Sequence, residues 1–82
     1  MIVYESAKRE ILDWLSETIH VPVDQIDLTK PLNEIGLDSL DAVHMIATVE
    51  GIIRQELPED IIRRVSCLND IFDLMRDKMA AA

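Results

Sequence analysis

Cysteine, glycine and aromatic residues are scarce in this 82-residue chain, which has one cysteine, two glycines, one tryptophan, one tyrosine and one phenylalanine. The single Cys67 has no partner for an internal disulfide, and no cysteines and histidines have the spacing of a zinc site. The sequence therefore argues against a fold held together by disulfides or metal. We expect a protein of the reducing cytoplasm.

Basic residues are also few, because eight Lys and Arg stand against sixteen Asp and Glu, a net charge of −8. Nucleic acids and anionic membrane surfaces would repel such a protein, so we expect partners with basic patches and no nucleic acid. No stretch approaches the roughly 20 apolar residues of a membrane span, and charged residues interrupt the N-terminal stretch where a signal peptide needs an apolar core. We expect neither feature here.

The spacing of apolar residues predicts three amphipathic helices, in which apolar side chains recur every three to four positions. These helices are expected over residues 4–19, from Asp38 with Pro58 limiting how far the helix can run, and over residues 67–78. Asp38 is expected to cap the second helix and Ser66 the last one, since short polar side chains bind the unpaired amides of a first turn.

The segments between these helices are of two kinds. Residues 21–36 have isolated apolar residues without a sustained period, which indicates a long ordered loop of the type that is often functional. A single helical turn is expected over residues 59–64, because Pro58 suits the position before a first turn. The predicted fold is an all-α small helical bundle of three longer helices plus one short helix, in one domain spanning residues 1–82 with a disordered tail at 80–82.

Two apolar stripes compete for the buried face of the second helix. The first stays apolar along the whole helix and should face the core: Ala42, Met45, Ile46, Val49 and Ile53. The second consists of Leu40, Val43 and Ala47 and is expected to lie partly in water beside Asp41 and His44. An exposed apolar patch rimmed by acid is a candidate docking surface.

The sharpest motif is Gly36-Leu37-Asp38-Ser39-Leu40-Asp41, which ends the loop and begins the second helix. A serine in a first turn lies beside unpaired backbone amides at the positive helix end, where an attached phosphate is favoured. A serine at this place is most often a cap, but Asp38 is the better cap here and leaves Ser39 available. Spacing alone keeps both interpretations open.

With this motif the chain resembles the acyl carrier proteins, the phosphopantetheine-bearing carriers of fatty acid and polyketide synthesis. Their signature is Asp-Ser-Leu after a glycine, and the resemblance extends over residues 4–79 without an insertion. Further matching stretches are Ile19-His20-Val21, Asp24-Gln25-Ile26, Pro31-Leu32, Leu57-Pro58-Glu59 and Ser66-Cys67-Leu68-Asn69-Asp70-Ile71. The resemblance implies that a phosphopantetheinyl transferase modifies Ser39 with coenzyme A as donor, and that the chain itself is no enzyme.

The resemblance also implies that the modified protein, a monomer, holds acyl groups as thioesters and delivers them to acyl-loading, ketosynthase-type and acyltransferase enzymes. The partner surface is expected around Ser39 and comprises Asp38, Leu40, Asp41, Val43, Ala47 and Glu50. Further acids expected to steer basic partners are Glu56, Glu59 and Asp60, against Arg54. A sheltered acyl chain is expected between the second and the short helix, against Ile46, Ile53, Ile62 and Leu68.

Some positions depart from the family pattern. His44 and Gly51 stand where acidic residues are common, and the short helix contains the aliphatic and basic run Ile61-Ile62-Arg63-Arg64. These departures favour a specialised or polyketide-type carrier over one of housekeeping fatty acid synthesis. An aminoacyl or peptidyl carrier is the nearer alternative, although the aspartate before Ser39 favours an acyl carrier. A helical adaptor that is not modified is the more distant one.

An enzyme would need a base beside Ser39, and the sequence does not supply one. The Gly-x-Ser-x-Gly elbow of hydrolases is absent. Five residues along a helix turn His44 about 140° away from Ser39. His20 is expected to interact with the end of the first helix, and the motif therefore predicts a carrier rather than a hydrolase.

Overall fold

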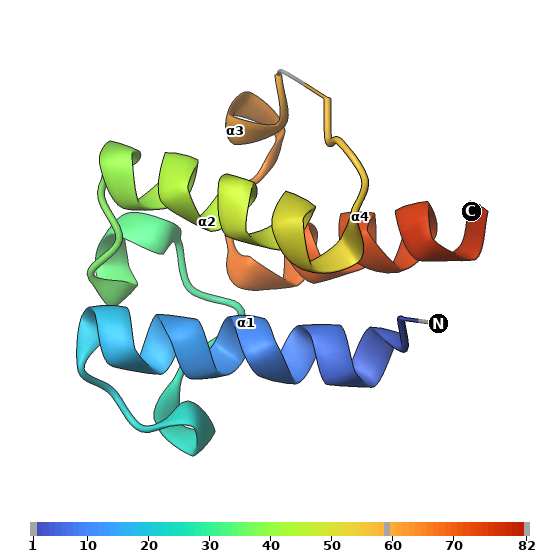
Figure 1. The fold of residues 1–82 in the computed structure, drawn as a ribbon. Helices are drawn as coiled ribbons and strands as arrows, with labels where there is room; N and C mark the ends of the chain where they lie inside the picture. The colour runs from blue at the N-terminus through green and yellow to red at the C-terminus, as the bar shows by residue number, and fades with distance from the viewer. Residues whose placement is uncertain (1, 59, 82) are drawn as a thin grey trace.

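The computed structural model describes residues 2–58 and 60–81, with all of their side chains except those of Ile62 and Ala81. Its elements, in chain order, are α1 (Tyr4–Ile19), the short 3-10 turns η1 (Val23–Gln25) and η2 (Leu32–Ile35), α2 (Ser39–Ile53), α3 (Ile61–Arg64) and α4 (Leu68–Ala81). Figure 1 shows α1, α2 and α4 packed side by side, with the single turn of α3 next to α2. The predicted all-α bundle of three longer helices and one short one is confirmed.

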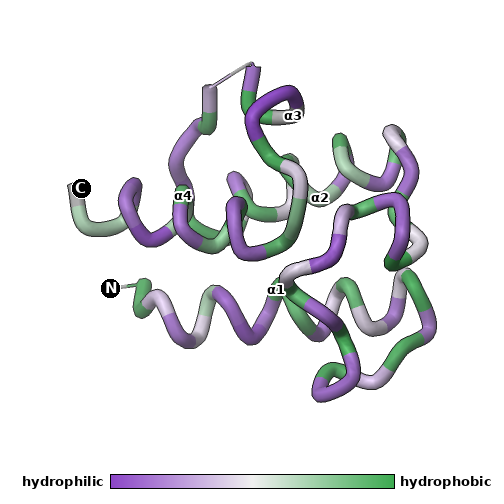
Figure 2. Tube along the Cα trace, turned by 180° about the vertical axis from the view of Figure 1, so that it is seen from behind, coloured by the Kyte–Doolittle hydropathy of each residue, from purple (hydrophilic) through white to green (hydrophobic). Residues whose placement is uncertain are grey.

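The core lies where the three long helices face one another. Figure 2 shows hydrophobic and hydrophilic positions alternating along these helices, as expected when one face of each is buried. The fully buried large side chains are Ile11, Leu15, Met45, Val49, Ile61, Leu68, Ile71, Phe72 and Met75. The predicted inner stripe of α2 is confirmed at Ala42, Met45, Val49 and Ile53, whereas Ile46 is half-buried.

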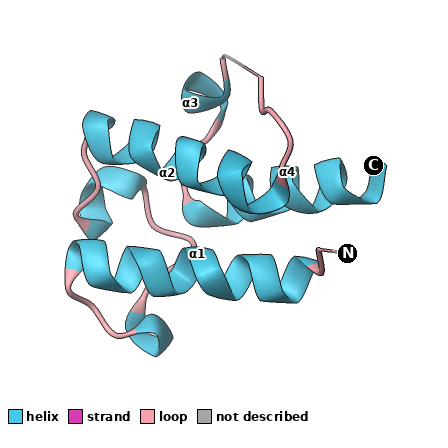
Figure 3. Cartoon of the chain, in the orientation of Figure 1, coloured by secondary structure: helices cyan, strands magenta, loops and turns pink. Residues whose placement is uncertain are grey.

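The connection between α1 and α2 is held in place at its middle, although most of it is drawn as loop in Figure 3. The Leu32 N–H donates to the Ser66 carbonyl at 3.0 Å, and the Asn69 N–H donates to the Leu28 carbonyl at 3.0 Å. Both bonds fasten the connection to the start of α4. The expected long loop is therefore ordered, but it contains two 3-10 turns that are too short to show a period in the sequence.

The start of α4 differs from the sequence-based expectation. Ser66 was expected to cap the helix, but its N–H and hydroxyl both donate to the Asp70 carboxylate, at 2.9 and 3.0 Å, and the Cys67 N–H donates to the same oxygen at 3.3 Å. Asp70, one turn further on, thus satisfies the amides that precede the helix. At the other end, Ala80 and Ala81 belong to α4 rather than to a tail, and Ala82 lies outside the described residues.

Replacing Asp70 is expected to change how stability depends on pH. The N–H and hydroxyl of Ser66 hold the pKa of Asp70 below its ordinary value of 3.8. A lowered pKa in the folded state stabilises the fold above the ordinary pKa, and this contribution is lost as pH falls through the folded-state pKa. Because the neutral amide oxygen of asparagine accepts weaker hydrogen bonds than a carboxylate, we expect Asp70→Asn to unfold at about 4–8 °C lower temperature at neutral pH, for a loss of about 1 kcal/mol.

Thermal unfolding followed by circular dichroism between neutral pH and pH 2 checks this prediction. The matched control is Asp77→Asn, because Asp77 is an exposed acid of the same helix and has no hydrogen bond or ion pair to a described side chain. The loss of stability on acidification should be smaller in Asp70→Asn than in the wild type or the control. If the unfolding temperatures of the two variants fell by the same amount on acidification, the role given to Asp70 would be contradicted.

Candidate functional site

A tight turn leads the chain from η2 into α2. Gly36 ends η2 in a left-handed conformation with φ +97°, which side chains rarely adopt, and its N–H donates to the Leu32 carbonyl. The following Leu37 N–H donates to the same carbonyl at 3.0 Å, and the Leu37 side chain is buried. These contacts fix the direction in which α2 begins.

The first turn of α2 is closed by a reciprocal pair of acids. The Asp38 carboxylate accepts a hydrogen bond from the Asp41 N–H at 2.8 Å, and the Asp41 carboxylate accepts one from the Asp38 N–H at 3.3 Å. This arrangement is a capping box, which satisfies two otherwise unpaired amides. The predicted capping role of Asp38 is confirmed, so the helix start does not depend on Ser39.

Ser39 is the first residue of the 15-residue α2, and it is exposed. Its hydroxyl forms no hydrogen bond with the described residues, in contrast to the neighbouring carboxylates. The positive end of the helix favours a phosphate there, whereas Asp38 and Asp41 disfavour it by their charge. The site therefore offers an accessible hydroxyl at a rigid helix start and not an enclosed anion pocket.

The expected apolar patch extends from Ser39 along α2. Leu40 is 63% exposed and Val43 is 47% exposed, and Ala47 is exposed as well. Asp41 is half-buried at the edge of this patch, because its carboxylate turns toward the Asp38 amide. The structure thus brings the sequence-predicted residues at the start of α2 together on one surface.

A cavity of about 240 Å³ opens beside this patch, between α2 and the segment that leads to α3. It is lined by Val43, Ile46, Ala47, Glu50, Leu57, Pro58 and Ile61. Glu50 has a second role there, since its half-buried carboxylate accepts a hydrogen bond from the Leu57 N–H at 2.8 Å. This bond joins residues seven positions apart across a turn, so the periodicity of the sequence could not reveal it.

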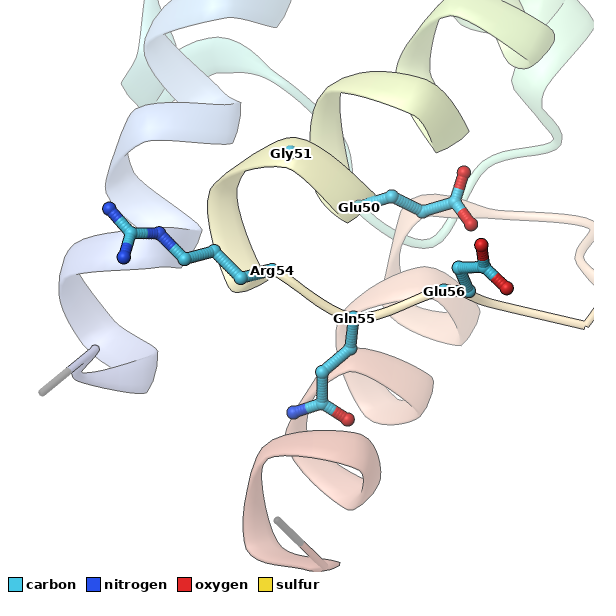
Figure 4. A pocket seen from close by; sticks show the side chains of 5 residues that line it. All are labelled: Glu50, Gly51, Arg54, Gln55 and Glu56. Carbon is cyan, nitrogen blue, oxygen red and sulfur yellow. The ribbon is translucent and has the colours of Figure 1, made fainter.

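Another hollow, of about 340 Å³, lies at the far end of α2. Figure 4 shows its lining residues, with the carboxylates of Glu50 and Glu56 on one side and Arg54 directed to the opposite side. Arg54 follows Ser39 by fifteen positions, which is about 22 Å along a helix axis. The Arg54 side of this hollow is therefore distant from Ser39, whereas Glu50 also lines the cavity beside the patch.

The described residues contain no group of three or more His, Cys, Asp or Glu side chains that could hold a metal ion. Within the same part of the chain, no helix has the length and apolar character needed to cross a membrane. Both histidines are exposed. Fold and site together define a small helical protein that presents the Ser39 hydroxyl beside an exposed apolar patch.

Comparison with known proteins identifies the family. Residues 9–75 match the family described as "Phosphopantetheine attachment site", and the chain belongs to this family. Its members are carriers that hold phosphopantetheine and do not catalyse a reaction themselves. The family recognised from the motif around Ser39 is thereby confirmed.

Three proteins named acyl carrier protein are similar to this chain over most of its length. The one from Guillardia theta is 34% identical over 62 residues, which cover 72% of this chain and 76% of the relative. The one from Thermosynechococcus vestitus is 28% identical over 79 residues, with coverage of 96% and 94%. The one from Coprothermobacter proteolyticus is 25% identical over 76 residues, with coverage of 92% and 93%.

Proposed function

We propose that this protein is an acyl carrier in which Ser39 is the residue that bears phosphopantetheine. The observation that carries the proposal is the exposed Ser39 hydroxyl at the first position of α2, which the capping box of Asp38 and Asp41 leaves uncommitted. In the transfer, this hydroxyl oxygen forms a bond to a phosphorus of coenzyme A and loses its proton to the transferase. The pyrophosphate bond of coenzyme A breaks, and adenosine 3′,5′-bisphosphate leaves.

The residues around Ser39 fit an attached arm that projects into solvent. When attached, phosphopantetheine supplies a terminal thiol that holds an acyl group as a thioester. The capping box satisfies amides of the helix start, and the negative charges of Asp38 and Asp41 repel a phosphate on Ser39. Leu40 and Val43 offer partner enzymes an apolar contact next to the modified hydroxyl.

The nature of the carried group is the finer part of the proposal. Relatives named acyl carrier protein favour an acyl group over an aminoacyl or peptidyl one. The exposed His44 and Gly51 on α2 favour a specialised or polyketide-type pathway, in the cytoplasm. The proposed partners are a phosphopantetheinyl transferase and the acyl-loading, ketosynthase-type and acyltransferase enzymes of that pathway, which the carrier meets as a monomer.

Mass spectrometry tests this proposal directly. Incubation with coenzyme A and a phosphopantetheinyl transferase should add the mass of one phosphopantetheine, and peptide mapping should place it on Ser39. The fragment ejected from protein isolated from its own cells should contain an acyl group. An aminoacyl or peptidyl fragment would support an aminoacyl or peptidyl carrier. A chain that is never modified would support a helical adaptor instead.

A sheltered acyl chain is expected to enter the cavity beside the docking patch. Ile46 lines this cavity, whereas Ile53 and Leu68 lie in the closed core with exposed fractions of 3% and 0%; the Ile62 side chain lies outside the described residues. Because α3 is a single turn, it can move aside while each buried methylene contributes about 0.8 kcal/mol.

Entry of the acyl chain into the cavity is measured by amide chemical shifts of the modified protein, first without an acyl chain and then with acyl chains of increasing length. Shifts that grow with chain length at Ile46, Leu57 and Ile61 are expected. The loop amides of Val21 and Ile35, which line a different hollow of about 210 Å³, serve as internal controls. Changes limited to Ser39 and its neighbours would mean that the chain stays in water.

A further inference from the structure

The charges along the surface beside Ser39 change sign from one end to the other. At the start of α2, Asp38 is exposed and Asp41 is half-buried, and both are acidic. The middle of this surface is apolar, and the Glu50 carboxylate further along accepts a hydrogen bond from the Leu57 N–H and keeps its charge. Asp38 and Asp41 thus form the acidic end of the surface next to Ser39.

The other end of the surface is formed by α3, which carries Arg63 and Arg64, both exposed. Ile61, the first residue of α3, is 2% exposed and lines the same cavity as Val43 and Ala47 of α2. Arg63 and Arg64 therefore lie within one helical turn of Ile61, which lines the cavity beside the apolar patch. Figure 1 shows this turn directly beside α2.

The described ion pair at α3 leaves its arginines accessible. Asp60 lies 3.9 Å from the Arg64 guanidinium, and about half of each side chain is exposed, at 60% and 53%. Exposed pairs of this kind are weak, and a guanidinium has further N–H donors to offer a partner. Glu56 borders the hollow at the far end of α2, and Glu59 lies outside the described residues. Arg63 and Arg64 therefore remain accessible guanidinium groups at α3.

We propose that the phosphopantetheinyl transferase of this chain docks through a dipolar face. Basic side chains of the transferase lie opposite Asp38 and Asp41, acidic side chains lie opposite Arg63 and Arg64, and an apolar contact covers the patch between them. The inference rests on the proposed modification of Ser39. Opposite charges at the two ends fix the docking orientation, because a reversed placement brings like charges together.

The decisive variant is Arg63→Glu/Arg64→Glu, tested by the rate of loading with coenzyme A and the transferase of the same organism. If docking depended only on the overall acidity of the carrier, added negative charge would raise the rate. A dipolar face predicts the opposite, a fall of about ten-fold in kcat/KM at low ionic strength that shrinks as salt is added.

Arg9→Glu/Arg76→Glu is the matched control, because it changes the net charge equally and removes exposed ion pairs with Asp13 and Asp73 on α1 and α4. Its loading rate should equal or exceed that of the wild type. Equal losses in both double variants, or unchanged or faster loading of Arg63→Glu/Arg64→Glu, would overturn the dipolar face.

Two further measurements separate this inference from folding and from the proposed function. Arg63→Gln/Arg64→Gln removes both charges with polar residues that form helices well, so a loss of about three-fold is expected even where glutamates would unwind α3. The Ile61 amide shift reports whether α3 is intact, and full activity of the glutamine variant would overturn the inference. A wild-type chain that is never labelled at Ser39 would instead refute the proposed function.

Discussion

Ser39→Ala is expected to abolish attachment of phosphopantetheine and to leave the fold unchanged. The hydroxyl is the only atom group that the substitution removes, and it forms no hydrogen bond with the described residues. The start of α2 is held by Asp38 and Asp41, whose bonds of 2.8 and 3.3 Å involve backbone amides and carboxylates that the substitution does not alter. Alanine is moreover a good helix former at a first helical position.

Two measurements on one sample decide this prediction. Intact mass after incubation with transferase and coenzyme A should show complete labelling of the wild type and none of Ser39→Ala. Circular dichroism should give unfolding temperatures that agree within a few degrees. Ser6→Ala, a change of an exposed serine on α1, is the matched control and should be labelled like the wild type.

Labelling and circular dichroism test different parts of this prediction. Labelling that persists on Ser39→Ala would move the attachment site to another residue and remove the basis of the proposed function. A large loss of helicity would instead show that Ser39 helps to hold α2, which contradicts the separation between cap and attachment site. Both outcomes are visible without knowledge of the acyl group.

The sequence predicted the features that depend on local periodicity and on single caps. The bounds of α1, the capping role of Asp38 and the exposure of Leu40 and Val43 all agree with the structure. Each follows from helical spacing or from the chemistry of one side chain in a first turn. This part of the fold carries the candidate site.

The features that the sequence missed depend on contacts between segments. The bond from the Leu57 N–H to Glu50 crosses a turn, and the Leu32 and Asn69 amides fasten the long connection to the start of α4. At the start of α4, the Asp70 carboxylate accepts three hydrogen bonds, from the N–H and hydroxyl of Ser66 and from the N–H of Cys67. Such pairings arise only once the chain has folded, so no local pattern announces them.

Charge at the start of α2 is expected to govern how fast a basic partner reaches Ser39. Asp41→Arg places a positive charge beside Ser39 and should slow the encounter with a basic partner. The natural comparison is an equal change of charge far from this surface. Asp70→Arg is unsuitable, because it would remove the bonds at the start of α4. Glu10→Arg is suitable, since Glu10 is exposed on α1 and borders a hollow with Ile52, near the other end of α2.

We expect Asp41→Arg to lower the rate constant of association with the transferase by about ten-fold or more at low salt, and Glu10→Arg to lower it about two-fold at most. The fold should tolerate Asp41→Arg, because the Asp38 carboxylate still accepts the N–H of residue 41 and only the longer bond of 3.3 Å is lost. Asp41→Asn removes the charge alone and should fall between the wild type and Asp41→Arg.

Stopped-flow association rates at several salt concentrations measure these differences. Because charges separated by more than about 8 Å are screened at physiological ionic strength, the gap between Asp41→Arg and the wild type should narrow as salt rises. Equal rates for Asp41→Arg and Glu10→Arg would mean that net charge alone governs the encounter. A gap that does not respond to salt would mean that contact with the side chain at position 41, rather than steering by its charge, limits docking. Either result would contradict steering by the proposed partner surface, because that steering depends on acidic charge localised at the start of α2.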